Sequence, residues 1–508
     1  MSGIVYLVGT GPGDPKLLTV KGRECLERAD VVFYDALANP VLLDLAPDSA
    51  ERYYVGKRSA AHSVPQEEMN ERLVEAAAVG KTVVRLKGGD PFIFGRGGEE
   101  AQRLREAGVT FEIVPGIPSP IAGPAYAGIP LTHRDHASSV AFVTGHERAE
   151  KTEDTVDLAA IGAAVDTVAI LMGTARLAGI VDDLVRGGRS EDTPVALVQW
   201  GTRPYQKTLV STLSSVVADV AEADVGSPAI IVVGDVVGLR DELAWFDTKP
   251  LFGKRIIVTR AREQSSSLVS LLSDGGAEVI EFPTIRTEAI ADPAPLDEGL
   301  RDLADDDWVV FTSANSVRYV WDRFDALSLD TRALGGVSVA AIGPATEAAL
   351  GARGIRPEFV ATRSRSEGVV ADIGDVDGTR ILVPRAEGGR EELVSGLRAA
   401  GATVTAVTAY RTVPDTGDAV RVADLLTDGG IDAVTFTSGS TVENFLAALP
   451  GDTAAGSLDD LCVAVIGPVT AEAARGRGLT VTVEAEAATV ESLADALVGH
   501  FGVALTAE

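Results

Sequence analysis

Two glycine-rich segments of the N-terminal half have the composition of ligand-binding loops. Gly9–Asp14 follows the short apolar run Ile4–Gly9, and Gly88–Phe92 follows a second apolar run, Thr82–Leu86. Adjacent glycines at the carboxyl end of a parallel strand let the backbone approach a small molecule closely. A tight turn into the following helix is the alternative explanation, and these segments alone leave both open.

The first segment also stands where a dinucleotide-binding fingerprint would lie. Asp35 ends a second strand pattern about twenty residues further on, which is the place of a ribose-binding acid in nicotinamide enzymes. However, Asp14 replaces the third glycine of that fingerprint, and Pro12 has no N–H to donate to a pyrophosphate. A nicotinamide oxidoreductase is therefore the weaker alternative, and NAD binding would revive it.

The elements that must position these loops alternate between strand and helix patterns. Ile4–Gly9 and Thr82–Leu86 predict strands, Pro15–Arg28 predicts a helix, and the pattern ends with an apolar strand over Ala229–Gly234. Such alternation is typical of an α/β fold with a largely parallel sheet. The periodicity fades over residues 238–253, which we expect to be an interdomain linker.

Beyond this linker the sequence repeats itself. Three short motifs return in the same order about 125 residues later: Arg255–Ala261 as Arg380–Ala386, Phe311–Ser313 as Phe436–Ser438, and Ile342–Thr346 as Ile466–Thr470. The repeat predicts two similar α/β lobes, whose facing loops would form a cleft suited to a ligand.

Composition limits the classes of function. The chain has 508 residues and a net charge of −29, which predicts about three or four compact units and argues against nucleic-acid binding. Adaptation to high salt and compositional drift in a GC-rich genome explain the excess of acidic residues equally well. No apolar run is long enough to span a bilayer, and the start of the chain lacks a signal-peptide pattern, so we expect no membrane partner.

The two cysteines, Cys25 and Cys462, are far apart and have no neighbouring metal-ligand pattern. This spacing argues against a disulfide framework and against a sequence-local zinc or iron–sulfur site. We therefore expect no metal and a reducing, cytoplasmic compartment.

Five segments of the first 240 or so residues, in order, resemble the signatures of uroporphyrinogen-III C-methyltransferases. They are Val5–Pro15, Gly88–Glu100, Val114–Ile117, Ala127–Arg134 and Val143–His146. The resemblance implies a dimeric, two-lobe methyltransferase that binds S-adenosylmethionine between its lobes.

Matching positions then imply a set of cofactor-binding residues. These are Pro12, Gly88, Gly89, Asp90, Ile93, Pro118, Ser119, Met172 and Gly201. The family more often has Thr-Ala or Ser-Ala after Pro-Gly-Ile, so Pro118 and Ser119 depart from the pattern.

The same resemblance assigns roles in catalysis. It implies Asp35 as proton acceptor and Lys57 as proton donor or charge partner, although a helix cap and a surface lysine are the ordinary roles of such residues. The implied substrate carries eight carboxylates and calls for cationic side chains in the loops. The candidates for substrate binding are Arg96, with Glu99 orienting it, and His133, Arg134 and His146.

The duplicated half resembles uroporphyrinogen-III synthase, through short motifs that include Phe311–Asn315, Tyr410–Thr412 and Ile466–Pro468. The resemblance implies that hydroxymethylbilane is cyclised with inversion of one ring and without a cofactor. Tyr410, which we expect at the end of a strand over Val404–Ala409, is the candidate acid, and a half-buried structural tyrosine is the alternative.

Four hydroxyl residues are candidate substrate ligands of this half: Ser313, Thr346, Ser438 and Thr470. All are expected at strand-to-helix turns, where they could bind carboxylates or, equally, cap helices.

The resulting organisation is a two-lobe methyltransferase over residues 1–245, with lobes of about 1–115 and 116–245, followed by a two-lobe synthase over 253–508. Lobe one of the synthase takes about 253–290 and 413–508, and lobe two about 291–412. Three alternatives remain: another precorrin or a diphthine-type substrate for the first half, and a non-catalytic two-lobe binding module for the second. We expect a homodimer formed through the methyltransferase half.

Overall fold

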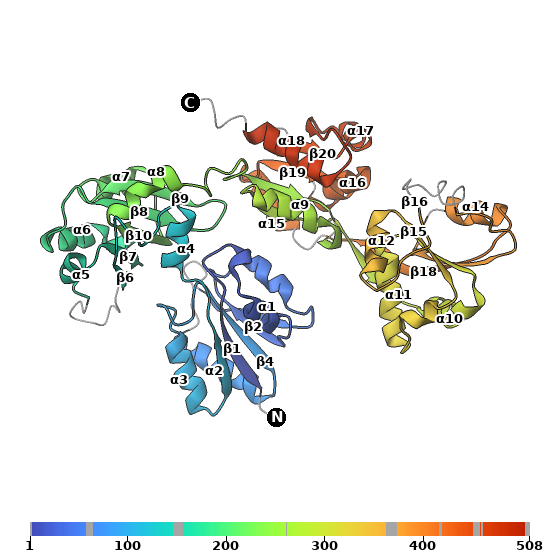
Figure 1. The fold of residues 1–508 in the computed structure, drawn as a ribbon, viewed down its shortest axis with the longest axis horizontal. Coiled ribbons are helices and arrows are strands. Elements are labelled where there is room, and N and C mark those ends of the chain that lie inside the picture. The colour runs from blue at the N-terminus through green and yellow to red at the C-terminus, as the bar shows by residue number, and fades with distance from the viewer. Residues whose placement is uncertain are drawn as a thin grey trace. The chain divides into compact units, whose positions relative to one another are not determined.

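The computed structural model describes residues 3–56, 65–145, 156–260, 262–361, 373–389, 391–415, 419–450, 458 and 461–502. The chain divides into two compact units, fewer than the three or four predicted from its length. Figure 1 traces the helices and strands of the chain. Unit 1 contains residues 1–256, 270–279 and 494–508, and unit 2 contains residues 257–269 and 280–493. Each unit contains α/β structure, as the sequence predicts.

The first sheet of unit 1 is parallel throughout. Its order is β3-β2-β4-β1-β5, with bounds Glu51–Tyr54, Val31–Tyr34, Thr82–Lys87, Ile4–Gly9 and Thr110–Val114. The covering helices are α1 (Val20–Leu26), α2 (Gln66–Ala78) and α3 (Gly97–Glu106). All five strands therefore present their carboxyl ends at one edge, where α/β folds bind ligands.

The helix expected over Pro15–Arg28 is wrong in its first half. A 3-10 turn covers Pro15–Leu17, and α1 begins only at Val20. The hydroxyl of Thr19 accepts a hydrogen bond from the amide of Gly22 and caps α1, which separates the two elements.

The second sheet of unit 1 is mixed, unlike the largely parallel sheet that we expected. Its order is β6-β7-β10-β8-β9, with bounds Val140–Thr144, Thr167–Leu171, Ala229–Val233, Pro194–Gln199 and Lys207–Thr212. Only β6 and β7 pair in parallel. The connection from β8 to β9 is too short for a crossover helix, so these strands pair antiparallel.

The helices of this lobe are α4 (Ser119–Tyr126), α5 (Leu158–Ala164), α6 (Leu177–Arg186), α7 (Val216–Glu222) and α8 (Arg240–Leu243). The segment that we expected to be a linker packs against α4. Trp245 and Phe246 lie 4.9 and 4.8 Å from the ring of Tyr126, and the Trp245 indole donates to the Ala125 carbonyl.

Residues 255–484 build two sheets that repeat one another. One has the order β12-β11-β19-β20-β21, with bounds Glu278–Glu281, Arg255–Val258, Ala433–Phe436, Cys462–Val465 and Val481–Glu484. The other has the order β13-β18-β17-β14-β15-β16, with bounds Ile285–Ala289, Thr403–Pro414, Arg380–Ala386, Trp308–Phe311, Ser338–Ile342 and Phe359–Ala361. Apart from the added edge strand β13, the strands correspond one to one, which agrees with the duplication seen in the sequence.

Helices flank these sheets. They are α9 (Arg262–Asp274), α10 (Ala294–Arg301), α11 (Ala314–Ala326), α12 (Pro344–Gly351), α14 (Glu392–Ala399), α15 (Ala419–Thr427), α16 (Gly439–Ala448), α17 (Pro468–Gly476) and α18 (Val490–Gly502). Each lobe has its own core, with fully buried Phe311 and Phe324 in one and Phe282, Phe436 and Phe445 in the other. Across the described ranges, no helix combines the length and apolarity needed to cross a bilayer.

Candidate functional site

Three strand ends of the first sheet meet through glycines. Gly11 and Gly89 exchange backbone hydrogen bonds of 3.2 and 2.8 Å, which ties the loop after β1 to the loop after β4. Gly116, after β5, lies so close that a Cβ there would be 2.3 Å from the Gly89 carbonyl oxygen. Backbone therefore approaches backbone at a distance that excludes any side chain.

Asp90 holds two of these loops in register. One carboxylate oxygen accepts from the Gly116 amide at 3.0 Å, and the other accepts from the Phe92 amide at 2.7 Å. The carboxylate thus accepts hydrogen bonds from backbone amides at the carboxyl edge of the sheet. Asp90 also lines the cavity described next.

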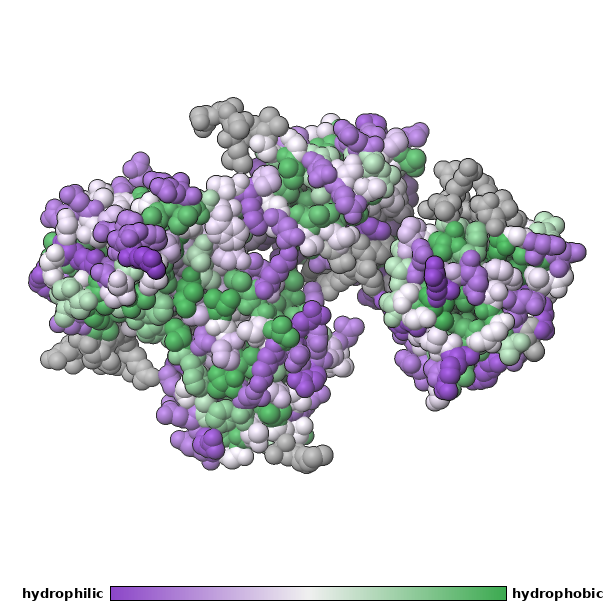
Figure 2. Space-filling view, viewed as in Figure 1, coloured by the Kyte–Doolittle hydropathy of each residue, from purple (hydrophilic) through white to green (hydrophobic). Residues whose placement is uncertain are grey.

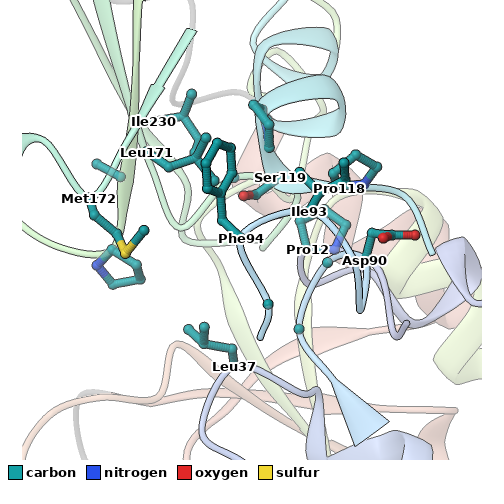
Figure 3. Close-up of a pocket in the computed structure, with 18 of the residues that line it drawn as sticks. Pro12, Leu37, Asp90, Ile93, Phe94, Pro118, Ser119, Leu171, Met172 and Ile230 are labelled. Atoms are coloured by element: carbon teal, nitrogen blue, oxygen red, sulfur yellow. The ribbon is translucent and has the colours of Figure 1, made fainter. Parts of the chain in front are cut away.

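A cavity of about 630 Å³ lies at this edge and takes its walls from both lobes of unit 1. All nine residues that the sequence suggested for the cofactor line it: Pro12, Gly88, Gly89, Asp90, Ile93, Pro118, Ser119, Met172 and Gly201. Figure 3 shows Met172 and Leu171 on one side and Pro12, Asp90 and Pro118 on the other. The volume is within the range of small-molecule sites.

The cavity walls contain strained backbone. Phe94, Arg96, Met172 and Trp200 all line the cavity and have positive φ, between 50° and 59°. Non-glycine residues rarely adopt this conformation, and when they do they cluster at ligand sites. Sequence reasoning missed both Trp200 and Phe94, although Phe94 lies within the signature segment Gly88–Glu100.

The walls are also largely apolar and open. Leu37 and Met172 are 49% and 51% exposed, and Phe94 is 44% exposed. Figure 2 shows hydrophobic residues reaching the surface in this part of unit 1. Exposed apolar side chains beside two carboxylates, Asp35 and Asp90, fit a ligand that combines an aromatic base with a cationic centre, as S-adenosylmethionine does.

The loop after β1 is not a phosphate cradle. The Asp14 amide donates to the Thr202 hydroxyl at 2.9 Å, and its carboxylate accepts from Lys16 N and the Tyr126 hydroxyl, both at 2.8 Å. Burial and this hydrogen bond raise the pKa of Tyr126. A carboxylate at this turn disfavours a pyrophosphate, which weakens the nicotinamide alternative.

Asp35 follows β2 and lines the same cavity. Its carboxylate accepts from the Leu37 amide at 3.1 Å and from Arg85 Nη2 at 3.0 Å. Sequence reasoning missed Arg85, and with it Lys87, Gln66 and the buried Glu100 beside them. The available signal was two cations, two residues apart, in an otherwise apolar strand pattern.

The residues suggested for substrate binding are only partly brought together. Arg96 lines the cavity and forms a two-point ion pair with Glu99, at 3.0 and 2.7 Å. His133 and Arg134 lie in the loop between α4 and β6 and do not line the cavity; the His133 ring packs 4.9 Å from that of His136. Lys57 and His146 lie outside the described residues.

In unit 2, Tyr410 lies within β18, which continues to Pro414, so the strand end that we expected at Ala409 is wrong. The extra length lets β18 pair antiparallel with β13. The Tyr410 hydroxyl is 3.0 Å from Ser313 Oγ, and its ring stacks on Tyr319 at 5.3 Å. Sequence reasoning missed Tyr319, whose hydroxyl contacts Arg318 and Thr287.

The four hydroxyl residues of the repeat occupy equivalent places. Ser313 and Ser438 cap α11 and α16, each accepting from the amide three residues on. Thr346 and Thr470 are buried in the first turns of α12 and α17, and Thr346 donates to the Ile342 carbonyl at 2.8 Å. Within the described residues, no group of three or more His, Cys, Asp or Glu could hold a metal ion.

Residues 4–217 match the family model of tetrapyrrole (corrin/porphyrin) methylases, and residues 266–495 match that of uroporphyrinogen-III synthase HemD. The porphyrin biosynthesis protein HemD of Ruminiclostridium josui is 38% identical over 499 residues, which cover 97% of each chain. The uroporphyrinogen-III C-methyltransferase of Bacillus subtilis is 44% identical over 334 residues, 66% of this chain and 68% of that one.

Solved structures include uroporphyrin-III C-methyl transferase from Thermus thermophilus complexed with S-adenyl homocysteine. It is 40% identical and covers 46% of this chain and 93% of its own, with a TM-score of 0.39. A mutant uroporphyrinogen III synthase from the same organism is 22% identical and covers 50% of this chain and 100% of its own, with a TM-score of 0.36.

The chain belongs to the tetrapyrrole methylase family through its first half and to the uroporphyrinogen-III synthase HemD family through its second. It is a fusion of a methyltransferase and a synthase, and thus a bifunctional enzyme of tetrapyrrole biosynthesis.

Proposed function

We propose that unit 1 methylates two ring carbons of uroporphyrinogen III to give precorrin-2, and that unit 2 makes uroporphyrinogen III from hydroxymethylbilane. The observation that carries the first part is the cavity of about 630 Å³ in unit 1, which collects Pro12, Asp90, Pro118, Met172 and Gly201 from separate segments of the chain. S-adenosylmethionine supplies the electrophilic methyl group, and the residues around it position and deprotonate the ring.

Asp35 is the proposed proton acceptor. An electron-rich pyrrole carbon forms a bond to the methyl carbon as the bond from that carbon to sulfur breaks, and a proton must then leave the macrocycle. Asp35 lies on the cavity wall, where hydrogen bonds from Leu37 N and Arg85 fix its carboxylate. A fixed carboxylate within the cavity can take that proton without a metal. Lys57 is the proposed proton donor or charge partner.

The carboxylates of the substrate need cations at the mouth of the cavity. We assign Arg96 to one of them, since it lines the cavity and Glu99 fixes its guanidinium through two hydrogen bonds. His133, Arg134 and His146 are proposed to bind carboxylates at the outer rim of a large, flat substrate.

In unit 2, loss of the terminal hydroxyl of hydroxymethylbilane leaves a reactive azafulvene, which the ring closure consumes. We assign Tyr410 to assist the departure of that hydroxyl as water, with Ser313 fixing the phenol at 3.0 Å. Thr346 and Thr470 lie at equivalent turns of the two lobes, and Ser438 lies at the turn equivalent to that of Ser313. These three residues are the proposed carboxylate contacts. This step needs no cofactor.

We further propose a homodimer formed through the methyltransferase half, which sedimentation equilibrium would test, and a cytoplasmic location. Cys25 and Cys462 are both free and buried, as suits a reducing compartment.

The methyltransferase assignment is tested with supplied uroporphyrinogen III and S-adenosylmethionine, followed by mass spectrometry of the product. We expect a product that carries two added methyl groups. Methylation of another precorrin or of a diphthine precursor, with none of uroporphyrinogen III, would overturn the substrate assignment.

A further inference from the structure

Three charged side chains are buried beside the cavity, two on the first sheet and one on α3. Arg85 and Lys87 are two residues apart on β4 and share one face of the strand, and Glu100 approaches them from α3. Their side chains are only 8%, 5% and 0% exposed. Burying three charges is costly, and an apolar core would be at least as stable, so the cluster calls for a reason other than stability.

Glu100 is the centre of this cluster. Its Oε1 accepts from Lys87 Nζ at 2.9 Å, from Gln66 Nε2 at 3.1 Å and from Arg85 Nε at 3.4 Å, whereas its buried Oε2 has no hydrogen-bond partner among the residues that the structure describes. Burial lowers the pKa of Lys87, the Arg85 charge lowers it further, and Glu100 opposes both effects. Glu100 is therefore the anion that makes two buried cations tolerable.

Arg85 connects Glu100 to the cavity. Its Nη1 donates to the Leu86 carbonyl at 2.6 Å, and its Nη2 donates to Asp35 Oδ2 at 3.0 Å. Glu100 and the Leu86 carbonyl thus hold two sides of the planar guanidinium, and its third side donates to the Asp35 carboxylate. Asp35, Arg85 and Lys87 line the cavity, but Glu100 does not.

We propose that Glu100 is a positioning residue for methyl transfer, which acts through Arg85 to fix the Asp35 carboxylate, with Lys87 as its charge partner. This inference rests on the proposed role of Asp35 as proton acceptor. Without the Glu100 charge, Arg85 keeps its bond to the Leu86 carbonyl but loses its ionic partner at Nε, and the orientation of Asp35 on which proton transfer depends is no longer fixed. A displacement of about 1 Å at a reacting group can reduce a rate about 100-fold.

The variant that tests this is Glu100→Gln in the full chain, with Glu106→Gln as the matched control on the exposed end of the same helix. We expect Glu100→Gln to lower kcat for methylation of supplied uroporphyrinogen III roughly 10- to 100-fold. The Kd for S-adenosylhomocysteine, measured by calorimetry, should change less than about threefold, since Glu100 does not reach the cavity. Glu106→Gln should leave both unchanged.

A double-mutant cycle distinguishes the proposed positioning role of Glu100 from a purely structural role. In the Asp35→Asn background, Glu100→Gln should reduce the remaining rate by less than about threefold, because the group that it positions is already disabled. Multiplicative losses, or a loss of S-adenosylhomocysteine binding equal to the loss of kcat, would overturn the proposal.

Should Glu100→Gln fail to fold, Arg85→Lys enters the same cycle, because it keeps the buried positive charge but lacks the fork that reaches Asp35 and Glu100 together. The same non-additivity with Asp35→Asn is expected, and additive losses would again overturn the proposal. Absence of methylation by the wild-type chain would instead refute the proposed function, so the two failures are distinguishable.

Discussion

The hydroxyl oxygens of Tyr410 and Ser313 lie 3.0 Å apart, and the Tyr410 ring stacks on Tyr319 with planes 10° apart. Ser313 also caps α11. One serine thus connects a helix N-terminus to a buried phenol, which fixes the phenol hydroxyl in a defined position.

Removal of that hydroxyl tests the role of Tyr410. Tyr410→Phe keeps the stacked ring, so we expect the fold to persist while conversion of hydroxymethylbilane to uroporphyrinogen III falls roughly 100-fold or more. Chromatography of the isomers measures this loss, and methylation of supplied uroporphyrinogen III by the same sample is the internal control. A variant with the wild-type cyclisation rate would show that Tyr410 is a structural tyrosine.

Asp35→Asn should impair methylation and leave cyclisation intact, the reverse of what we expect for Tyr410→Phe. The amide keeps the shape and the contact with Arg85 but cannot accept the ring proton, so methylation should fall about 100-fold or more while cyclisation is unchanged. Single-turnover rates of both reactions decide the matter. Equal loss of both activities would mean that the substitution damages the chain as a whole.

The contact between Gly116 and Gly89 predicts a loss of cofactor binding on Gly116→Ala. The added Cβ would lie 2.3 Å from the Gly89 carbonyl oxygen, so one of the two loops must move. We expect affinity for S-adenosylhomocysteine to fall at least tenfold, by about 1.4 kcal/mol. Gly98→Ala is the matched control, because a Cβ there has open space and favours α3. Unchanged binding by Gly116→Ala would show that this junction does not shape the site.

The stability contributed by the ion pair between Asp297 on α10 and Arg323 on α11 should depend on pH. Arg323 donates two 2.7 Å hydrogen bonds to Asp297 and lowers the pKa of that carboxyl from 3.8. The stabilisation is complete above the unfolded-state pKa and is lost as the pH falls through the folded-state pKa. Arg323→Met should therefore cost about 2 kcal/mol at pH 7, and the difference from wild type should shrink in acid.

Hydrogen exchange in α10 and α11 measures that free energy. The control is Arg332→Met, whose exposed pair with Asp330 should contribute less than about 1 kcal/mol. A difference for Arg323→Met that is constant from neutral to acidic pH would contradict the assignment.

Local patterns were sufficient to predict much of the architecture. The repeat predicted two equivalent lobes, and the equivalence extends to the backbone at Ser313 and Ser438, where φ is −164° in both and ψ is 161° and 162°. The predicted strands Ile4–Gly9 and Thr82–Leu86 are β1 and β4, the latter one residue longer. Apolar runs and glycine-rich turns are short-range signals, which the sequence displays directly.

The cluster around Glu100 was not predictable in the same way. Its members come from α2, β4 and α3, and only the tertiary structure brings Gln66, Arg85 and Glu100 together. The antiparallel strands of the second sheet depend on connection length and pairing, which apolar patterns do not encode. Roles in catalysis for the residues of both sites stay predictions that the variants above test.

The central claim is that one chain carries both activities, and it is tested most directly by incubating the purified chain with hydroxymethylbilane, with and without S-adenosylmethionine. We predict precorrin-2 when the methyl donor is present and uroporphyrinogen III when it is absent. Accumulation of the type I isomer alone, or uroporphyrinogen III that remains unmethylated with the donor present, would contradict it.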